Sequence, residues 1–226
     1  MADDWYGDWY KWHELYDDPE SGLALRLEMV RDRVRAALDE APPGPLRAIS
    51  VCAGQGTDLI GALAGHPRRG DVTARLVELD PRNTEVARRL AAEAGLTCVE
   101  VVTGDASLAG QYADIAPADL VLVCGLFGNV TDADIEAMAG YCTQLCATGG
   151  TVIWTRGRWE PDLTPRVCAW FEERGFERVW LSDARELRGQ SVGAHRFTRT
   201  PAPLERDAVM FTFVGHNTAQ GPSRSR

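Results

Sequence analysis

The sequence predicts an α/β fold with a doubly wound, mostly parallel seven-stranded sheet, an antiparallel last strand and an N-terminal helical lid. Three observations predict it. Apolar, strand-like runs alternate with helical patterns from residue 46 onward, a glycine-containing turn follows the first run, and no helical pattern precedes the last run. Strand–helix alternation indicates parallel strands joined by helical crossovers. A last strand that lacks such a crossover is expected to enter by a hairpin, antiparallel to its neighbour.

Seven runs have strand character. They cover residues 46–52, 74–79, 97–102, 118–124, 151–155, 176–181 and 208–214. The first, third and fourth are dense in Val, Ile and Leu, which is typical of strands buried on both faces of a parallel sheet. The polar, Arg-rich stretch 182–207 is expected to be a long connection to the last strand.

Five stretches have helical periodicity. They cover residues 22–40, 58–64, 81–94, 132–147 and 163–174. Asp80 followed by Pro81 is typical of a helix start, because aspartate caps the first turn and proline is favoured at the first helical position. Thr131 and Asp134 resemble a capping box at the start of the fourth helix.

Composition and charge exclude several classes of protein. Of the 226 residues, 45% are hydrophobic and 25% charged, as in ordinary globular domains. No apolar run approaches the ~20 residues of a membrane span, and the acidic, aromatic start is unlike a signal peptide, so we expect a cytoplasmic protein with no membrane partner. The 24 basic and 33 acidic residues give a net charge of −9, which argues against a nucleic-acid partner.

The negative charge is concentrated in an aromatic leader, residues 1–20, which holds seven acidic residues, one basic residue and six aromatic residues. Trp5, Trp9, Trp12 and Tyr16 recur there at helical spacing. Two interpretations stay open: a stripe that packs this helix on the domain, or a mobile lid whose rings enclose a planar or cationic substrate.

We divide the chain into three segments: the leader with its helix (1–45), a cofactor-binding domain (46–215) and a tail rich in Gly, Ser, Pro and Arg (216–226) that is expected to be disordered. The six cysteines are expected to be reduced thiols. Cys142 and Cys146 lack further metal-ligand partners at suitable spacing, so no metal is expected. We expect a monomer or a homodimer.

The turn after the first strand holds Gly54 and Gly56 directly before a helix. Glycines at such a turn let the backbone come close to a ligand. An acidic residue follows at the end of the second strand, close to the ~20-residue offset of a ribose-binding carboxylate. We prefer Glu78 to Asp80 for this role, because Asp80 caps the next helix. Leu79 would then offer an apolar surface to an adenine ring.

Two further strand ends complete the predicted site. Asp105, after the third strand, is suited to accept a hydrogen bond from an adenine amine, although an ordinary turn aspartate would also explain it. Residues 124–129, after the fourth strand, begin with small side chains at the switch between the two halves of the sheet. Ligands bind at this point in open α/β sheets.

In these features the sequence resembles the class I, seven-stranded S-adenosylmethionine (SAM)-dependent methyltransferases, over about residues 46–215. The resemblance rests on residues 53–56, 78–81, 104–106 and 118–125. It implies SAM as cofactor, S-adenosylhomocysteine as product, and methyl transfer by in-line displacement. The cofactor contacts that it implies are Cys52, Ala53, Gly54, Gly56, Asp58, Glu78, Leu79, Asp105, Ala106, Cys124 and Gly125.

The sequence departs from this family at two positions. The family's acid at the end of the first strand aligns with Ser50, and the first glycine of its loop aligns with Cys52. The contact to the amino group of SAM would then fall to Asp58 or to the carbonyl of Cys124. The Asn-Pro-Pro-Tyr signature of many methyltransferases that act on nucleobase or amide nitrogen is absent, which favours a small-molecule acceptor such as a secondary metabolite.

Two other functions stay open. A non-catalytic SAM-fold sensor or scaffold protein is compatible with the altered positions Ser50 and Cys52. A nicotinamide-dependent oxidoreductase is less favoured, because Leu59 stands where the dinucleotide motif has its third glycine. An acidic chain also suits a cationic cofactor.

Histidine is the side chain best suited to act as a general base near neutral pH. Two histidines are candidates, because the segments that hold them are both expected to cover the carboxyl edge of the sheet: His195, in the stretch before the last strand, and His13, in the leader. Of the two we prefer His195. An ordinary polar role is the alternative for each.

The substrate contacts are expected from two regions. The ends of the fourth and fifth strands supply three residues and the leader supplies three more: Asn129, Trp154, Arg156, Trp9, Trp12 and Tyr16. Arg156 would hold an anionic substrate group, unless it belongs to a solvated loop.

Overall fold

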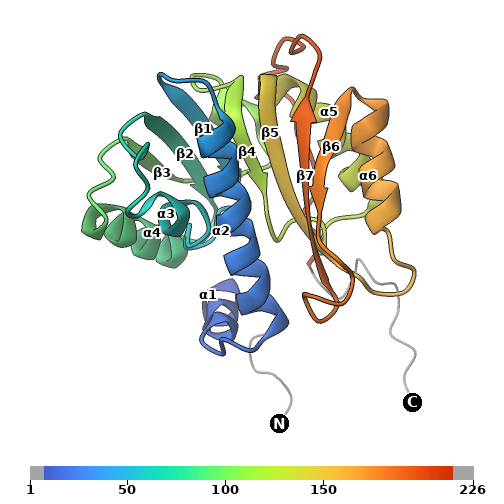
Figure 1. Cartoon of the computed structure of the whole chain (residues 1–226), viewed down its shortest axis with the longest axis horizontal. Coiled ribbons are helices and arrows are strands. Elements are labelled where there is room, and N and C mark those ends of the chain that lie inside the picture. Colours follow the sequence, from blue (N-terminus) through green and yellow to red (C-terminus); the bar gives the residue numbers. More distant parts are fainter. Residues whose placement is uncertain (1–7, 216–226) are drawn as a thin grey trace.

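A computed structural model describes residues 8–215. The predictions for Trp5 and for the tail 216–226 therefore lie outside the described residues. The described chain forms a seven-stranded sheet in the order β3-β2-β1-β4-β5-β7-β6 (Figure 1). The strands pair in parallel except β7, which is antiparallel to both β5 and β6. The predicted fold class is confirmed.

The strands lie close to the predicted positions over most of the chain. They are β1 (Leu46–Val51), β2 (Val72–Glu78), β3 (Val99–Thr103), β4 (Ala118–Val123), β5 (Cys146–Gly157), β6 (Phe176–Leu181) and β7 (Gln190–Phe197). The helices are α1 (Trp9–Trp12), α2 (Gly22–Glu40), α3 (Leu59–Leu63), α4 (Pro81–Glu93), α5 (Asp132–Leu145) and α6 (Thr164–Glu173), with 3₁₀ turns η1 (His13–Tyr16) and η2 (Ala109–Tyr112).

Helices cover both faces of the sheet, as Figure 1 shows. The alternation of side chains along β4 explains why both faces are apolar. Leu120 and Leu122 join the core formed with α2, α3 and α4, whereas Val121 and Val123 join the core formed with α5 and α6. This strand is buried on both faces, which is the state that its run of Val and Leu predicts.

The predicted last strand is misplaced. Residues 208–214 form one isolated bridge, between Leu108 and Val209, and the antiparallel strand is β7, at 190–197. The polar residues of β7 concealed its strand character in the sequence. Gly193 is required where β7 passes β5, because a Cβ atom there would lie 2.3 Å from the indole ring of Trp154.

Residues 208–214 instead run along the carboxyl edge of the sheet. The Met210 N–H donates to the Ser107 carbonyl at 2.8 Å, and the Val214 N–H donates to the Asn129 carbonyl at 2.8 Å. Met210 and Phe211 are therefore buried against the loops after β3 and β4, whereas Val209 and Phe213 are exposed.

Arg68 stabilises the turn that follows α2. Its Nη1 donates to the carbonyls of Leu38 (2.7 Å) and Ala41 (2.8 Å), and its Nη2 donates to those of Pro42 (2.9 Å) and Gly44 (3.0 Å). Carbonyls at the end of a helix have no partner within the helix. One guanidinium thus supplies hydrogen-bond donors to four carbonyls of the turn that leads from α2 into β1.

We expect Arg68→Met to lower the free energy of unfolding by about 2 kcal/mol, because hydrogen bonds from a charged donor are lost together. The neighbouring exposed residue provides the control: Arg69→Met should change stability by less than about 0.5 kcal/mol. Urea denaturation of both variants measures the difference. Equal values would show that these hydrogen bonds contribute nothing net.

Candidate functional site

The main cavity has a volume of about 230 Å³ and lies at the carboxyl ends of β1, β2 and β4. β1 and β4 are neighbours in the sheet, and the order of strands reverses between them. Open α/β sheets bind ligands at such a switch point. Its lining comprises Trp9, Trp12, His13, Tyr16, Arg26, Leu27, Cys52, Ala53, Gly54, Thr57, Asp58, Glu78, Leu79, Asn83, Asp105, Ala106, Cys124, Gly125, Asn129, Phe211 and Phe213.

The glycine loop after β1 turns through three residues of positive φ: Cys52 (51°), Gly54 (54°) and Gly56 (65°). The left-handed region is easily reached by glycine and strained for cysteine. Gly56 is also required sterically, because a Cβ atom there would lie 2.6 Å from the Leu76 side chain. Gly56 is buried and does not line the cavity, so its part is to shape the loop.

Glu78 joins the glycine loop to the end of β2. One carboxylate oxygen accepts from the Gly54 N–H and the other from the Asp80 N–H, each at 2.9 Å. Asp80 caps α4 by accepting from the Arg82 N–H, and it also pairs with the Arg82 guanidinium. Asp80 therefore caps α4 as the sequence predicts, and Glu78 lies at the cavity.

The loops after β3 and β4 supply further polar groups. Asp105 lines the cavity and accepts from the Ser107 N–H at 2.9 Å. After β4, the Gly125 N–H donates to Thr155 Oγ1 at 2.8 Å, and Asn129 Nδ2 donates to the Gly125 carbonyl at 2.7 Å. Two buried atoms of the lining residues have no partner among the described residues: Asn83 Nδ2 and Asn129 Oδ1.

Asp58 is partly buried in the cavity wall. Its Oδ1 accepts from the Leu59 N–H at 2.7 Å, at the start of α3. Burial raises the pKa of the Asp58 carboxyl, opposed by that hydrogen bond and by the charges of Arg31 and Arg26.

The leader forms one wall of the cavity. Trp9, Trp12 and Tyr16 all line it, and their rings pack in sequence with centroids 6.0 Å and 5.3 Å apart. Asp8 pairs with Arg82 at 2.7 Å and so ties the leader to the start of α4. Of the leader's two interpretations, packing is realised in these contacts, and the same rings face the cavity.

His13 packs on the glycine loop. Its Nδ1 lies 2.7 Å from the Trp9 carbonyl and therefore donates, which leaves Nε2 to accept from the Gln55 N–H at 3.3 Å. Burial lowers the pKa of His13, so the ring is neutral near pH 7. A Cβ atom on Gly54 would lie 2.5 Å from Nε2, so only glycine allows this packing.

Sequence reasoning missed several lining residues, among them Leu27, Thr57 and Asn83 and two further parts of the wall. Arg26 reaches the cavity from α2, and Phe211 and Phe213 reach it from the segment after β7. Phe213 packs edge-on against Trp9, with centroids 5.4 Å apart. The signal available for the phenylalanines was their apolar alternation, which the sequence analysis assigned to a strand.

His195 and Trp154 do not line the cavity, which corrects their predicted roles. Both are fully buried in the paired strands β7 and β5, where Trp154 Nε1 donates to His195 Nδ1 at 3.1 Å. The His195 ring also stacks on Phe171 at 5.1 Å. The predicted antiparallel strand was placed too late, so His195 was assigned to a loop over the sheet edge instead of to the core.

Arg156 is also absent from the cavity lining. It lies near the end of β5, is 9% exposed and donates through Nη1 to the Phe127 carbonyl. Burial lowers the pKa of this guanidinium. Asn129, in contrast, does line the cavity as predicted.

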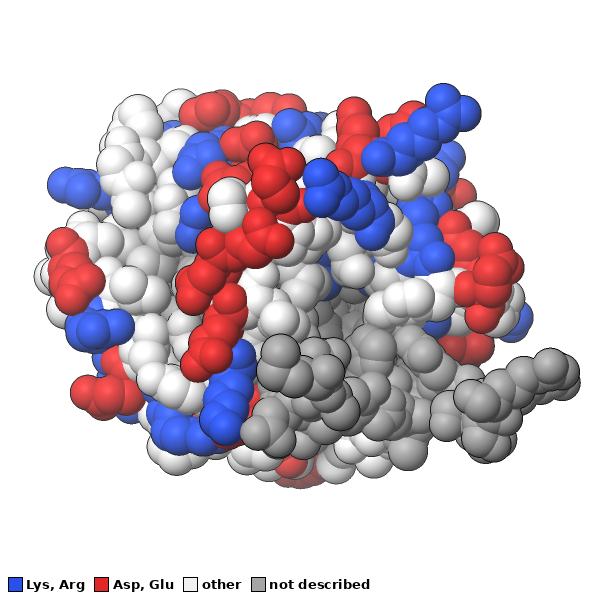
Figure 2. All heavy atoms as spheres, turned by 90° about the horizontal axis from the view of Figure 1, so that it is seen from below, with Lys and Arg blue, Asp and Glu red and all other residues white. Residues whose placement is uncertain are grey.

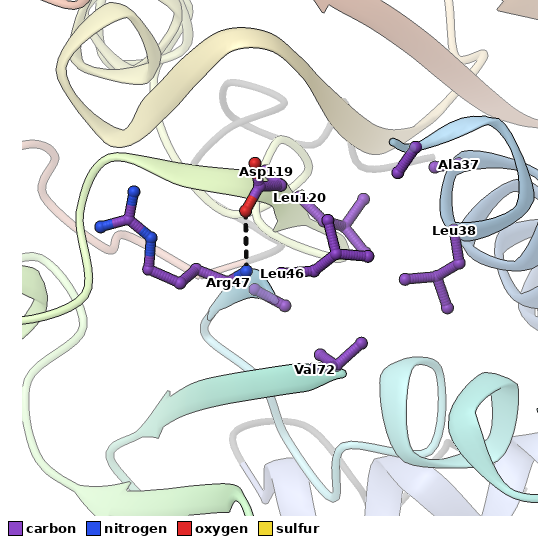
Figure 3. Close-up of a pocket in the computed structure, with 9 residues that line it drawn as sticks. Ala37, Leu38, Leu46, Arg47, Val72, Asp119 and Leu120 are labelled. Carbon is purple, nitrogen blue, oxygen red and sulfur yellow. Dashed lines mark hydrogen bonds between the residues drawn. The ribbon is translucent and has the colours of Figure 1, made fainter. Parts of the chain in front are cut away.

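Two further cavities lie among the described residues. One lies at the opposite, amino ends of β1, β2 and β4 against α2, where the Arg47 N–H donates to Asp119 (Figure 3). Its volume of about 10 Å³ is close to the space for one water molecule. The other, of about 370 Å³, is larger than the main cavity and lies between the leader, α2 and the glycine loop. It shares His13, Tyr16, Leu27 and Thr57 with the main cavity.

Acidic side chains gather in a band on the side of the molecule where the leader lies (Figure 2). Among the leader's described acids, Glu14, Asp17, Asp18 and Glu20 are exposed. Within residues 8–215, no set of three or more His, Cys, Asp or Glu residues is arranged to hold a metal ion. That same range holds no helix with the length and apolar character that a bilayer crossing requires.

Several similar solved structures are named as methyltransferases. An O-methyltransferase family protein from Burkholderia thailandensis is 17% identical with a TM-score of 0.60, and covers 77% of this chain and 57% of its own. The CurJ carbon methyltransferase is 15% identical with a TM-score of 0.60, and the match covers 76% of this chain and 54% of CurJ. Magnesium protoporphyrin IX methyltransferase from Synechocystis, solved with bound SAM, is 13% identical with a TM-score of 0.60 (77% and 81%). This chain has the class I methyltransferase fold.

The comparisons bear on the fold and leave the substrate open. Comparison with protein-family models and with curated proteins gives no match. The chain spans 57% and 54% of the length of the first two similar structures. Other proteins with this fold are named as a pre-rRNA processing protein and an rRNA methylase, so the methyltransferase fold serves acceptors of very different size.

The burial of His195 predicts a pH dependence of stability. Burial, together with the charge of Arg178, lowers the pKa of His195 to about 4. Because an unfolded histidine titrates near 6.5, protonation favours the unfolded chain, and stability should fall by about 1.4 kcal/mol per pH unit between pH 6.5 and 4. His195→Gln keeps an acceptor for Trp154 but cannot titrate. Its unfolding free energy, measured from pH 7 to 4.5, should fall less steeply than that of the wild type. Parallel curves would contradict the assignment.

Proposed function

We propose that the protein is a SAM-dependent methyltransferase that transfers a methyl group to a small-molecule acceptor by in-line displacement. The observation that carries this proposal is the position of Glu78. Its carboxylate is held at the cavity by the Gly54 and Asp80 N–H groups, beside a glycine loop at the switch point of the sheet. Each oxygen keeps a second lone pair for a ligand hydroxyl.

The residues of the cavity fit SAM. Glu78 would accept from the ribose hydroxyls, and Asp105 would accept from the adenine amine, with Leu79 and Ala106 beside the ring. Asn83 Nδ2 is a buried donor without a partner among the described residues, as expected where a ligand completes a site. Asp58 or the Cys124 carbonyl would receive the amino group, next to the backbone of Cys52, Ala53 and Gly54. Gly125 would lie at the floor. These carboxylates also suit a cationic sulfonium.

When bound, SAM supplies a methyl group on a positively charged sulfur. The protein's own task is then to hold the acceptor in line and to exclude water. The rings of Trp9, Trp12 and Phe213 supply an apolar wall for this purpose, and Asn129 offers a buried amide oxygen to an acceptor donor group. Tyr16 completes the proposed substrate contacts.

His13 is the proposed general base, if the acceptor needs one. It lines the main cavity and is neutral near pH 7, which is the form that takes up a proton. The proton would go to Nε2, whose present bond to the Gln55 N–H is long, at 3.3 Å. Nδ1 would keep its bond to the Trp9 carbonyl and hold the ring in place.

The charge of the protein supports a small acceptor rather than RNA. The net charge is −9, and exposed acids gather on the face where the leader walls the cavity (Figure 2). An acidic surface repels phosphates, whose binding needs Lys and Arg.

We expect isothermal titration calorimetry to detect binding of S-adenosylhomocysteine. Glu78→Gln should weaken it about 10- to 100-fold, because hydrogen bonds to a charged acceptor are lost. Asp80→Asn is the matched control: asparagine still caps α4, so the affinity should change less than about threefold.

The absence of any binding by the wild type would refute the proposed function. Equal losses in the two variants would instead refute only the assignment of the ribose contact to Glu78.

A further inference from the structure

Arg26 is a buried cation in the wall of the main cavity. Arg26 lies on α2, the helix that leads into the sheet domain, and only 7% of the residue is exposed. The guanidinium lies 5.9 Å from the ring centroid of Trp12. It is thus enclosed between the leader, α2 and the cavity.

The partners of Arg26 are neutral. Nη1 donates to the Gln190 side-chain carbonyl at 3.1 Å, and Nη2 donates to the Tyr16 hydroxyl at 2.9 Å. Within residues 8–215 no carboxylate oxygen lies within 4.0 Å of the Arg26 guanidinium, the distance limit of an ion pair. Two other arginines of α2 do have acids: Arg31 pairs with Glu28, and Arg35 with Asp32. Arg33, which forms no ion pair in residues 8–215, lies over the ring of Trp180 instead.

An enclosed cation without an anion is costly, because water is removed and no opposite charge replaces it. Asp58, the acid that faces the same cavity, forms no ion pair with Arg26, and its own oxygen is used to start α3. Arg26 therefore has no direct ion-pair partner among the described residues, although it and Asp58 act on each other through their charges. An anionic group of a molecule in the cavity would supply that partner. A guanidinium fits a carboxylate best, since two parallel N–H groups meet its two oxygens.

We propose that Arg26 binds the carboxylate of a ligand in the main cavity. Two ligands would offer this group there. One is the cofactor, through its methionyl end, and this assignment rests on the proposed function; the other is an acidic acceptor. If the carboxylate is that of the cofactor, Asp58 would face the amino group beside it. In either case Tyr16 would hold the guanidinium in place through its hydroxyl.

The first measurement compares two adenosine compounds by calorimetry. S-adenosylhomocysteine carries the carboxylate, and methylthioadenosine lacks the whole amino-acid group. If the carboxylate is that of the cofactor, Arg26→Gln should weaken the first by about tenfold or more and leave the second unchanged. Arg26→Lys should lose less affinity for S-adenosylhomocysteine than Arg26→Gln does. Arg35→Gln is the control: Arg35 lies on the same helix in an exposed ion pair, so the affinity for neither compound should change.

The second measurement tests an acidic acceptor. Benzoate is the probe, because the cavity is lined by aromatic rings, and benzamide is its neutral counterpart. If the carboxylate belongs to the acceptor, the wild type should bind benzoate and not benzamide, with or without S-adenosylhomocysteine, and Arg26→Gln should lose benzoate binding while both adenosine compounds bind as before.

The outcomes separate the two proposals. A wild type that binds neither adenosine compound refutes the methyltransferase, while benzoate still tests Arg26. An equal loss of both adenosine compounds in Arg26→Gln would mean that Arg26 only supports the wall, and overturns the proposal. Unchanged binding of both, together with no difference for benzoate, overturns it as well.

Discussion

The hydrogen bonds of the Glu78 carboxylate organise the floor of the main cavity. Two backbone N–H groups from different loops converge on one side chain, so the loop after β1 and the start of α4 are fixed relative to each other. This geometry requires the positive φ of Gly54, and Gly54 in turn leaves room for His13. A single acid at a strand end thereby positions the loop, the helix and the leader together.

The upper walls follow a different principle. They are aromatic, come from segments outside the parallel half of the sheet, and meet through ring contacts such as Trp9 with Phe213. The floor therefore uses polar groups with fixed directions, and the walls use apolar surface that adapts to shape. Arg26 is the exception, a charge set among rings and neutral oxygens.

Most of the fold and the floor could be predicted from the sequence, because they depend on local patterns. The runs that became β1 and β4, the cap at Asp80 and the offset from the glycine loop to Glu78 are all readable in order along the chain. His195 and Phe211 were not, since both depend on which apolar alternation pairs with β5. Residues 190–197 pair with β5 despite their polar members, and Gly193 leaves room there for the ring of Trp154.

The contact between Trp9 and Phe213 also bears on the order of assembly. These residues stand near the two limits of the described chain, yet they close the same wall. Contacts between distant positions form slowly, since a long loop must close first. On the ribosome, the sheet from β1 to β5 can form while Phe213 is still unmade. The growing chain would then expose the tryptophans of its leader until residues 211–213 are made and close the wall.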